Sequence, residues 1–367
     1  MATLGANDLK QYAIPTNWDA ATLTQIRLES GETYDAWLSD VSQALAMANN
    51  ELLADPLING LISVTTEPAV EYRSGTSNGF EEATEYGRPD AKRAATVGHM
   101  LPLKYYDRMM KWTWMFLSKA RRAQLDADIA DAIQDVKNIW RKTVIDRLFD
   151  SDAVTIGSSG KSVPFADGGT ADSSYIPVAM PDRGGSFAYT HNHFAALNGI
   201  TQANLETAVL NLWEHGHDGP YDLLISQSDI SSWTDTTNVT GYIPTPDPLI
   251  RYGAQTDLAA VAGPDWIGVV ETDYGACRIR ANARIPTKYW ALYKSFGRLD
   301  QRNPLRVRYN ERRGIGALLL AGDHIREYPL ENAIMWMEFG VGVGEDRTAA
   351  VLSYNDGGGT YSDPTIS

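Results

Sequence analysis

The sequence predicts an α+β fold in which helices come first and strands come last. Two observations support this class. Apolar residues recur every three or four positions in two segments of the first 150 residues, which is the spacing of one helical face. From about Trp266 onward, short runs rich in β-branched and aromatic residues alternate with turn residues, which is typical of strands. Helices and strands do not alternate regularly, so a parallel α/β sheet is not expected.

The N-terminal segment, residues 1–62, is expected to be an arm that contains one helix. Ser30-Gly31-Glu32-Thr33 supplies helix-capping side chains, and Asp55-Pro56 supplies a stop. The apolar positions between them lie on one helical face: Tyr34, Trp37, Leu38, Val41, Leu45, Ala48 and Leu52.

Residues 63–104 have the composition of a long extended loop. Val64–Thr66 and Thr96–Leu103 favour extended backbone, and the polar, glycine-containing stretch between them has no core pattern. Excursions of this length are uncommon in compact domains unless they are functional or disordered. Charges segregate along it, with the acidic Glu81, Glu82 and Glu85 followed by the basic Arg88, Lys92 and Arg93. We expect these six residues to contact other subunits if the loop reaches a neighbouring chain, because separated charge clusters fix the register of a partner.

The strongest helical pattern covers Ser118–Asp150, with Ser118 as the expected cap. Its apolar stripe is Leu125, Ile129, Ile133, Val136, Trp140, Val144 and Leu148. A second helix is expected from Thr201 to Gly216, followed by a buried strand at Tyr221–Ser226 and a short helix at Asp229–Trp233. The later expected strands are Trp266–Glu271, Cys277–Ile285, Tyr289–Tyr293, Leu305–Tyr309, Gly314–Leu320, Ile334–Val343 and Thr348–Leu352. The glycine-rich stretch after Asn355 predicts a flexible end.

Composition excludes several classes of protein. The 367 residues carry 32 Lys and Arg against 46 Asp and Glu, a net charge of −14, which argues against a wholly nucleic-acid-binding or membrane-binding surface. The single cysteine, Cys277, excludes an intrachain disulfide and a cysteine-based zinc site, and it suits a reducing cytoplasm. The sequence shows no signal peptide and no apolar run of about 20 residues, so neither export by that route nor a membrane helix is expected.

Basic residues concentrate in one segment, residues 278–313. It holds eleven Lys or Arg and two acidic residues, which makes it +9 and leaves −23 for the remainder. The arginines proposed for subunit or DNA contact are Arg298, Arg302, Arg306, Arg308, Arg312 and Arg313. The alternative is that they pair with acidic side chains of the same chain, and pairing within or between subunits is favoured over DNA contact because acidic partners are abundant.

No segment of the sequence has both the residues and the structural context that a catalytic or cofactor-binding motif requires. Gly157–Ser162 ends like a phosphate-binding loop but lacks the first glycine and the strand–loop–helix context. Gly340-Val341-Gly342-Val343-Gly344 lies in a strand region, where glycine is better explained by bends or close backbone contact. The pairs His191/His193 and His215/His217 could each offer two metal ligands, but neither pair has a third ligand at recognisable spacing, and capping or turn roles are favoured. We therefore expect no catalytic residue, no metal and no cofactor.

The order of these elements resembles the major capsid proteins of tailed bacteriophages, with the Hong Kong-phage-type shell fold. The stretches that carry this resemblance are Ser118–Asp150, Thr201–Ser226, Trp266–Glu271, Asn303–Arg308 and Phe339–Ala350. The resemblance implies an extended β-hairpin loop that crosses a neighbouring subunit and a long spine helix in a peripheral domain. The implied organisation is an arm (1–62), the extended loop (63–104), a peripheral domain (105–200), an axial domain (201–299), strands returning to the peripheral domain (300–352) and a flexible tail (353–367).

The resemblance also implies a function without catalysis. The chain would be a structural shell subunit that assembles into pentamers and hexamers of an icosahedral head. Its implied partners are other copies of itself, a separate scaffold protein, a portal, a possible decoration protein and double-stranded DNA bound without sequence specificity. It would assemble in the host cytoplasm and reside in the virion. Two alternatives remain at this point: an encapsulin-type compartment shell, and a carbohydrate-active enzyme suggested by 10 Trp and 18 Tyr.

Overall fold

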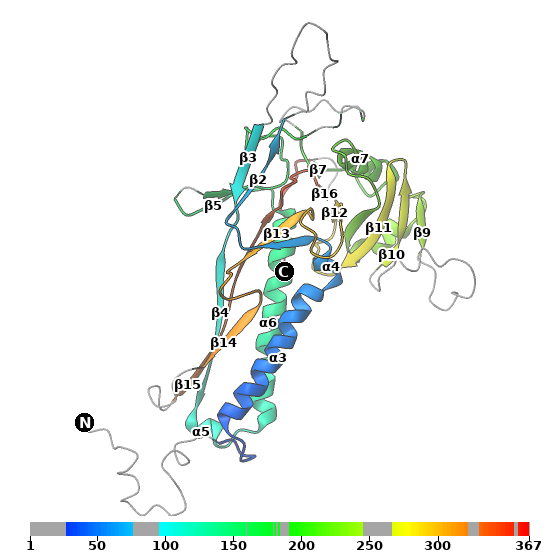
Figure 1. Cartoon of the computed structure of the whole chain (residues 1–367). Helices are drawn as coiled ribbons and strands as arrows, with labels where there is room; N and C mark the ends of the chain where they lie inside the picture. The colour runs from blue at the N-terminus through cyan, green and yellow to red at the C-terminus, as the bar shows by residue number, and fades with distance from the viewer. Residues whose placement is uncertain are drawn as a thin grey trace, which may run out of the picture. The chain divides into compact units, whose positions relative to one another are not determined.

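The structure is a computed structural model, shown in Figure 1, and it confirms the α+β class. It describes residues 27–75, 95–158, 160–178, 180, 183, 191–244, 266–321, 330–355 and 359–366. The chain forms two compact units. Unit 1 comprises Met1–Leu52, Tyr105–Asn138 and Ile315–Glu338, and unit 2 comprises Leu53–Lys104, Ile139–Gly314 and Phe339–Ser367. Within the described residues, no helix combines the length and apolar character that crossing a membrane requires.

Unit 1 is built on helix α3 (Tyr34–Ala54) and the first half of helix α6 (Arg122–Phe149). Helix α3 begins after Thr33, whose side-chain oxygen accepts a hydrogen bond from the Ala36 amide at 3.3 Å. Its buried face is the predicted one: Tyr34, Trp37, Val41, Leu45, Ala48 and Leu52. The two helices are joined by polar pairs, since Trp37 Nε1 donates to Asp126 at 2.8 Å and Arg122 bridges to Asp40 at 2.6 Å.

The strands of unit 1 are most of β4 (Lys104–Thr113), β14 (Ala317–Ala321) and the first part of β15 (Leu330–Val343). A short helix, α5 (Trp114–Leu117), follows β4. Strands β14 and β15 pair antiparallel, with Ala317 opposite Met337. The Asn49 side chain of α3 bonds both the amide and the carbonyl of Ala317, each at 2.9 Å. Gly316 lies against Asn49 with φ at +114°, so any larger residue there would meet both a clash and an unfavourable backbone conformation.

Unit 2 contains two sheets and two small ladders. In the first sheet, β1 (Ile62–Thr65) lies parallel to β13 (Leu305–Tyr309), which pairs antiparallel with Phe339–Val343 of β15. The ladders are β2 (Ala69–Ser74) with β3 (Ala95–Met100), and β5 (Val154–Ile156) with β6 (Gly160–Ser162). The predicted role of the glycines in β15 is confirmed, because a Cβ on Gly340 would lie 2.2 Å from the Pro102 carbonyl oxygen.

The second sheet of unit 2 has seven strands in the order β7-β16-β12-β8-β11-β10-β9. Their bounds are β7 Phe194–Ala196, β8 Tyr221–Ser226, β9 Tyr242–Pro244, β10 Trp266–Thr272, β11 Gly275–Asn282, β12 Tyr289–Tyr293 and β16 Ala350–Tyr354. Helix α7 (Gln202–Trp213) packs its apolar face on this sheet, and the short helices η2 (Gln227–Asp229) and α8 (Ile230–Thr234) follow β8. All six residues of β8 are buried, as expected for a central strand.

The structure differs from the sequence-based expectations at three places. The long helix begins at Arg122 instead of Ser118, because Ser118 closes the turn of α5 by donating to the Met115 carbonyl. Strand β4 was not expected, since most of its side chains are exposed and it lacks a clear apolar alternation. Within residues 359–366 of the end expected to be flexible, two residues contact the rest of the chain: the Tyr361 hydroxyl donates to the Phe149 carbonyl at 2.8 Å, and Ile366 is buried.

The segment Gly157–Ser162, which ends like a phosphate-binding loop, includes the turn between strands β5 and β6. Gly157 and Ser158 lie between β5 and β6, and Lys161 donates to the Ala171 carbonyl. The loop interpretation of this segment is confirmed, since strands stand on both sides of the turn.

Candidate functional site

The base of the β2–β3 hairpin is the part of the expected extended loop that the structure describes. The two strands pair antiparallel over six positions, from Ala69 opposite Met100 to Ser74 opposite Ala95 (Figure 1). Of the two extended segments that the sequence predicted, Thr96–Leu103 is confirmed over β3 of this ladder. The other, Val64–Thr66, lies mostly in β1, which pairs with β13 and not with β3. The described ladder therefore ends at a directly paired position, Ser74 opposite Ala95.

This hairpin base packs on its own subunit. Its inward side chains, Val70 and Tyr72, form a small buried cluster with Leu101, Ala166 and Tyr175. The rings of Tyr72 and Tyr175 meet edge to face with centroids 5.5 Å apart, an arrangement that aromatic pairs favour. Ser74 adds a polar link, because its hydroxyl accepts from the Ile176 amide at 3.0 Å. The loop formed by residues 164–176 thus holds the hairpin in place.

A fully buried arginine, Arg347, organises that loop. It lies in the turn between β15 and β16, and its guanidinium donates to the carbonyls of Pro164 at 2.8 Å and Phe165 at 3.4 Å. The same guanidinium reaches a carboxylate oxygen of Asp172 at 3.4 Å. A buried charge is tolerated only when it is paired and hydrogen-bonded, and these contacts meet both conditions.

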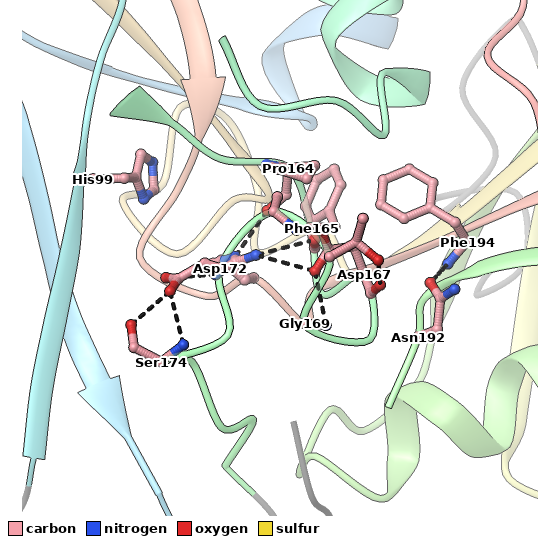
Figure 2. Close-up of polar contacts among 12 residues, drawn as sticks. His99, Pro164, Phe165, Asp167, Gly169, Asp172, Ser174, Asn192 and Phe194 are labelled. Atoms are coloured by element: carbon pink, nitrogen blue, oxygen red, sulfur yellow. Dashed lines mark hydrogen bonds and ion pairs between the residues drawn. The ribbon is translucent and has the colours of Figure 1, made fainter. Parts of the chain in front are cut away.

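The remaining contacts fix the loop around this arginine. Figure 2 shows Pro164, Phe165, Asp167 and Asp172 gathered on one loop, with Asp172 bonded to Ser174. The Asp167 carboxylate accepts from the amide of Gly169 at 3.1 Å, which shapes the turn. The Arg347 guanidinium also lies 4.3 Å from the centre of the Tyr175 ring, a cation–π contact. Arg347 therefore connects the β15–β16 turn to the aromatic cluster under the hairpin.

A second buried polar residue, His99 of β3, faces the same cluster. Its ring contacts the Tyr72 hydroxyl at 3.3 Å through Nδ1 and the Val343 carbonyl oxygen at 3.0 Å through Nε2. The carbonyl can only accept, so Nε2 carries the proton. Burial lowers the pKa of His99 to about 4, in spite of the bond to Val343. The positive charges of Arg347, Arg147 and Arg306 act in the same direction as burial.

We expect acid to destabilise the fold through His99. The folded pKa of about 4 lies below the ordinary value of 6.5, so the unfolded state binds a proton first as the pH falls. The stabilisation is fully present above about pH 6.5 and is lost between about pH 6.5 and 4, by at most roughly 3 kcal/mol. The measurement is urea unfolding of the unassembled chain at pH 7, 5.5 and 4. The His99→Gln variant should lose less stability than the wild type over this range, and an equal loss in both proteins would contradict the prediction.

The six charged residues expected to contact other subunits, Glu81, Glu82, Glu85, Arg88, Lys92 and Arg93, lie outside the described residues. The six basic-segment arginines are described and differ in their surroundings. Arg306 is buried and pairs with Glu345 at 3.0 Å, and Arg308 donates to the Leu101 carbonyl at 3.2 Å. Arg302 is exposed and pairs with Asp300 at 3.0 Å. Arg298, Arg312 and Arg313 are exposed.

These placements separate the two interpretations of the basic segment. For Arg306 and Arg308 the intrachain interpretation is favoured, because their guanidinium groups already bind groups of the same chain. Arg298, Arg312 and Arg313 keep exposed side chains and remain candidates for contact with a neighbouring subunit or DNA. The central role of Arg347 was not recognised from the sequence, although an arginine just after the apolar strand Phe339–Val343 is an unusual residue to bury.

Comparison with known proteins gives a structural match and no sequence match. No family model and no curated protein sequence matches the chain. A solved structure titled "Mycobacterium phage Patience" is similar, with a TM-score of 0.64 and 22% sequence identity over 96% of this chain and 97% of that one. The capsid of a native GTA particle has a TM-score of 0.45, with 13% identity over 82% and 90%. An encapsulin complex from Synechococcus elongatus has a TM-score of 0.46, with 11% identity over 84% and 90%.

The first of these matches spans nearly the whole of both chains, so it includes both sheets of unit 2, the long helix α6 and the hairpin base. The chain has the major capsid fold of tailed bacteriophages.

Proposed function

We propose that this chain is the major shell subunit of a tailed double-stranded DNA bacteriophage, assembling into the pentamers and hexamers of an icosahedral head. The observation that carries this proposal is the match over almost the full length of a phage structure, at a TM-score of 0.64. The fold alone does not specify a function, so the hairpin supplies a second argument. A paired ladder that continues into a charged excursion suits a subunit whose stability depends partly on contacts with its neighbours.

In this proposal the parts of the chain have separate tasks. Residues 201–299, which hold α7 and most of the seven-stranded sheet, would form the axial domain near the centre of each capsomer. Residues 105–200 and 300–352 would form the peripheral domain, with α6 as its spine. Residues 1–62 would be the arm, and residues 63–104 the loop that crosses to a neighbouring subunit. Residues 353–367 would end the chain, packed at 359–366.

The proposed partners follow from this role. Copies of the chain would bind one another, and a separate scaffold protein, a portal and a possible decoration protein would join during assembly in the host cytoplasm. The DNA inside the virion would be contacted weakly and without sequence specificity, because the chain has a net charge of −14. The shell would act by self-association and would catalyse no reaction.

The burial of five of the ten tryptophans gives less support to the enzyme alternative. Tryptophans can serve as sugar-binding platforms only when they are exposed, and Trp37, Trp112, Trp140, Trp233 and Trp290 are all buried. They supply core packing, which is the commoner use of aromatic side chains.

The test of the shell role is assembly. The untagged chain, expressed with and without its scaffold, is examined by sedimentation velocity and negative-stain microscopy, and closed shells or capsomers are expected. A chain that stays monomeric at high concentration with scaffold present would overturn the proposal. Particles isolated from the source should contain DNA and a portal. Particles that hold a protein cargo and no DNA would instead indicate the encapsulin alternative.

We expect replacement of residues 75–94 by Asn-Gly to leave the subunit folded and to abolish shell closure. Ser74 and Ala95 are directly paired, and a two-residue Asn-Gly turn is the connection that antiparallel strands at this spacing accept. The change removes all six charged residues proposed for subunit contact. The measurements are circular dichroism with thermal unfolding for the fold and microscopy for assembly.

A matched variant separates charge from loop length. Glu81, Glu82 and Glu85 are replaced together by Gln, which keeps the length of the loop and removes its acidic cluster. This variant should assemble more slowly or less completely than the wild type, with the larger difference at low salt. Normal shells from the Asn-Gly variant would show that the loop is not required, and the loop assignment would then be wrong.

A further inference from the structure

Three histidines from separate parts of unit 2 meet in its interior. His191 and His193 precede β7, and His215 lies just after α7. Their ring centroids are 4.9 Å apart for His191 and His193, and 5.0 Å apart for each of these with His215. One ligand-capable ring nitrogen from each histidine lies within 4.8 Å of the other two. The third ligand that the pair His191/His193 lacks in the sequence is supplied by His215.

Backbone hydrogen bonds fix which nitrogen faces the centre. His193 contacts the Ala350 carbonyl oxygen through Nδ1 at 2.9 Å, and His215 contacts the Val178 carbonyl oxygen through Nδ1 at 2.6 Å. A carbonyl oxygen only accepts, so both Nδ1 atoms are donors and carry the ring proton. In the neutral ring, Nε2 then has a lone pair. Metal-binding histidines in proteins are oriented in this way, with the second nitrogen donating to a carbonyl or carboxylate.

The two Nε2 atoms face each other at 3.1 Å. Two lone pairs at that separation repel, so the contact needs either a second proton on one ring or a cation that both nitrogens share. A cation held between the two nitrogens would remove this repulsion inside the fold, where His193 is 0% and His215 is 6% exposed.

A shared cation fits the spacing. Zinc–imidazole bonds of about 2.0–2.1 Å at a tetrahedral angle place two ligand nitrogens roughly 3.3 Å apart, close to the observed 3.1 Å. The third ring, His191, is half-buried, and one of its ring nitrogens lies within 4.8 Å of those of His193 and His215. His215 also lines a cavity of about 510 Å³ whose wall includes Tyr72 and Tyr175.

The fourth histidine of the two pairs has a different role. His217 lies 3.1 Å from a carboxylate oxygen of Asp346 and 3.3 Å from the Thr348 hydroxyl. It holds the β15–β16 turn, as the structural interpretation of these pairs expects. Only three of the four histidines therefore point to one centre.

We propose that His191, His193 and His215 bind one Zn²⁺ ion through three imidazole nitrogens, with a water molecule as the fourth ligand. The ion would link the segment before β7 to the end of α7. Through the hydrogen bonds of His193 and His215 it would also hold Ala350 of β16 and Val178. Its role is that of a structural link, and it does not depend on the proposed shell function.

The test uses the untagged, unassembled chain. After treatment with EDTA and desalting, ZnCl₂ is titrated in a calorimeter, and metal content is measured by mass spectrometry after a second desalting. We expect one Zn²⁺ per chain with a Kd in the micromolar range or tighter, and a rise in Tm of several degrees. Co²⁺ in place of Zn²⁺ should give the strong visible absorption of a four-coordinate ion.

The diagnostic variant is His191→Ala, because His191 is the least buried of the three and its replacement disturbs packing least. Its Zn²⁺ affinity should fall at least tenfold, and the Zn²⁺-dependent rise in Tm should disappear. The matched control, His99→Gln, changes a buried histidine outside the cluster and should bind Zn²⁺ as the wild type does.

If His191→Ala fails to fold, the wild type still decides the question, since Zn²⁺ should protect these histidines from diethyl pyrocarbonate. Any of three results would overturn the proposal: no retained Zn²⁺, unchanged affinity in His191→Ala, or no protection. Failure of this site would leave shell assembly unaffected, so the two proposals are tested separately.

Discussion

Replacing Arg347 with Met should lower the free energy of unfolding by about 3–5 kcal/mol, the range found when one partner of a buried ion pair is removed. The guanidinium is fully buried, and the substitution removes the donor to the carbonyls of Pro164 and Phe165 and the positive charge beside the Asp172 carboxylate. Methionine fills much of the arginine's volume, so the loss reports on polar contacts more than on a cavity. The measurement is the urea midpoint of the unassembled chain, with the m-value checked for two-state behaviour.

The matched control is Arg302→Met. Arg302 also pairs with an acidic residue, Asp300, but its side chain is 66% exposed. Water replaces its contacts when the partner is lost, so no measurable change in Tm is expected. Equal effects of the two substitutions would mean that Arg347 does not organise the loop under the hairpin.

Trp290→Ala should destabilise unit 2 by about 3–5 kcal/mol, the usual cost of removing a buried Trp side chain and leaving a cavity. Trp290 lies on β12, which pairs with both β8 and β16, and it is 1% exposed. Its ring meets Trp233 edge to face with centroids 5.4 Å apart. The measurement is chemical unfolding followed by near-ultraviolet circular dichroism, which reports on these two rings.

Ile243→Ala is the control for Trp290→Ala in the same sheet. Ile243 lies on the edge strand β9 and is 43% exposed, so its truncation should cost less than about 1 kcal/mol. A loss at Trp290 as small as the loss at Ile243 would show that the centre of this sheet tolerates a cavity and is not the stabilising core described above.

Elements with strong local signals could be predicted from the sequence. The stripe from Tyr34 to Leu52 and the Asp55-Pro56 stop predicted α3, because a helix that buries one face needs that spacing whatever it packs against. Thr201 predicted the start of α7, and the structure confirms its capping bond to the Asn204 amide at 3.2 Å. Strands β8, β12 and β13 begin and end at the predicted residues. Turn-forming residues flank each of these apolar segments, so the sequence itself marks where the strand starts and stops.

Features that depend on three-dimensional proximity could not be predicted in this way. Strand β4 is set by its pairing with β15 and is mostly exposed, so its residues carry little apolar pattern. Arg347 binds carbonyls nearly 200 positions earlier in the chain, and no local rule connects them. The histidine cluster is the clearest case. In the sequence, neither His-x-His pair has a third ligand at a recognisable spacing, which argued against a metal site. In the structure the third ring is that of His215, which lies 22 residues after His193 in the chain.

The directly paired residues at the open end of the β2–β3 ladder have a consequence for engineering and for evolution. Since Ser74 and Ala95 stand opposite each other, the two chain ends at that point are as close as in any tight turn. A foreign peptide or a folded tag grafted between them would start and finish at one place and would leave the register of both strands unchanged. Changes in the length of this segment would then cost the monomer little stability, because the pairing of β2 with β3 is unchanged.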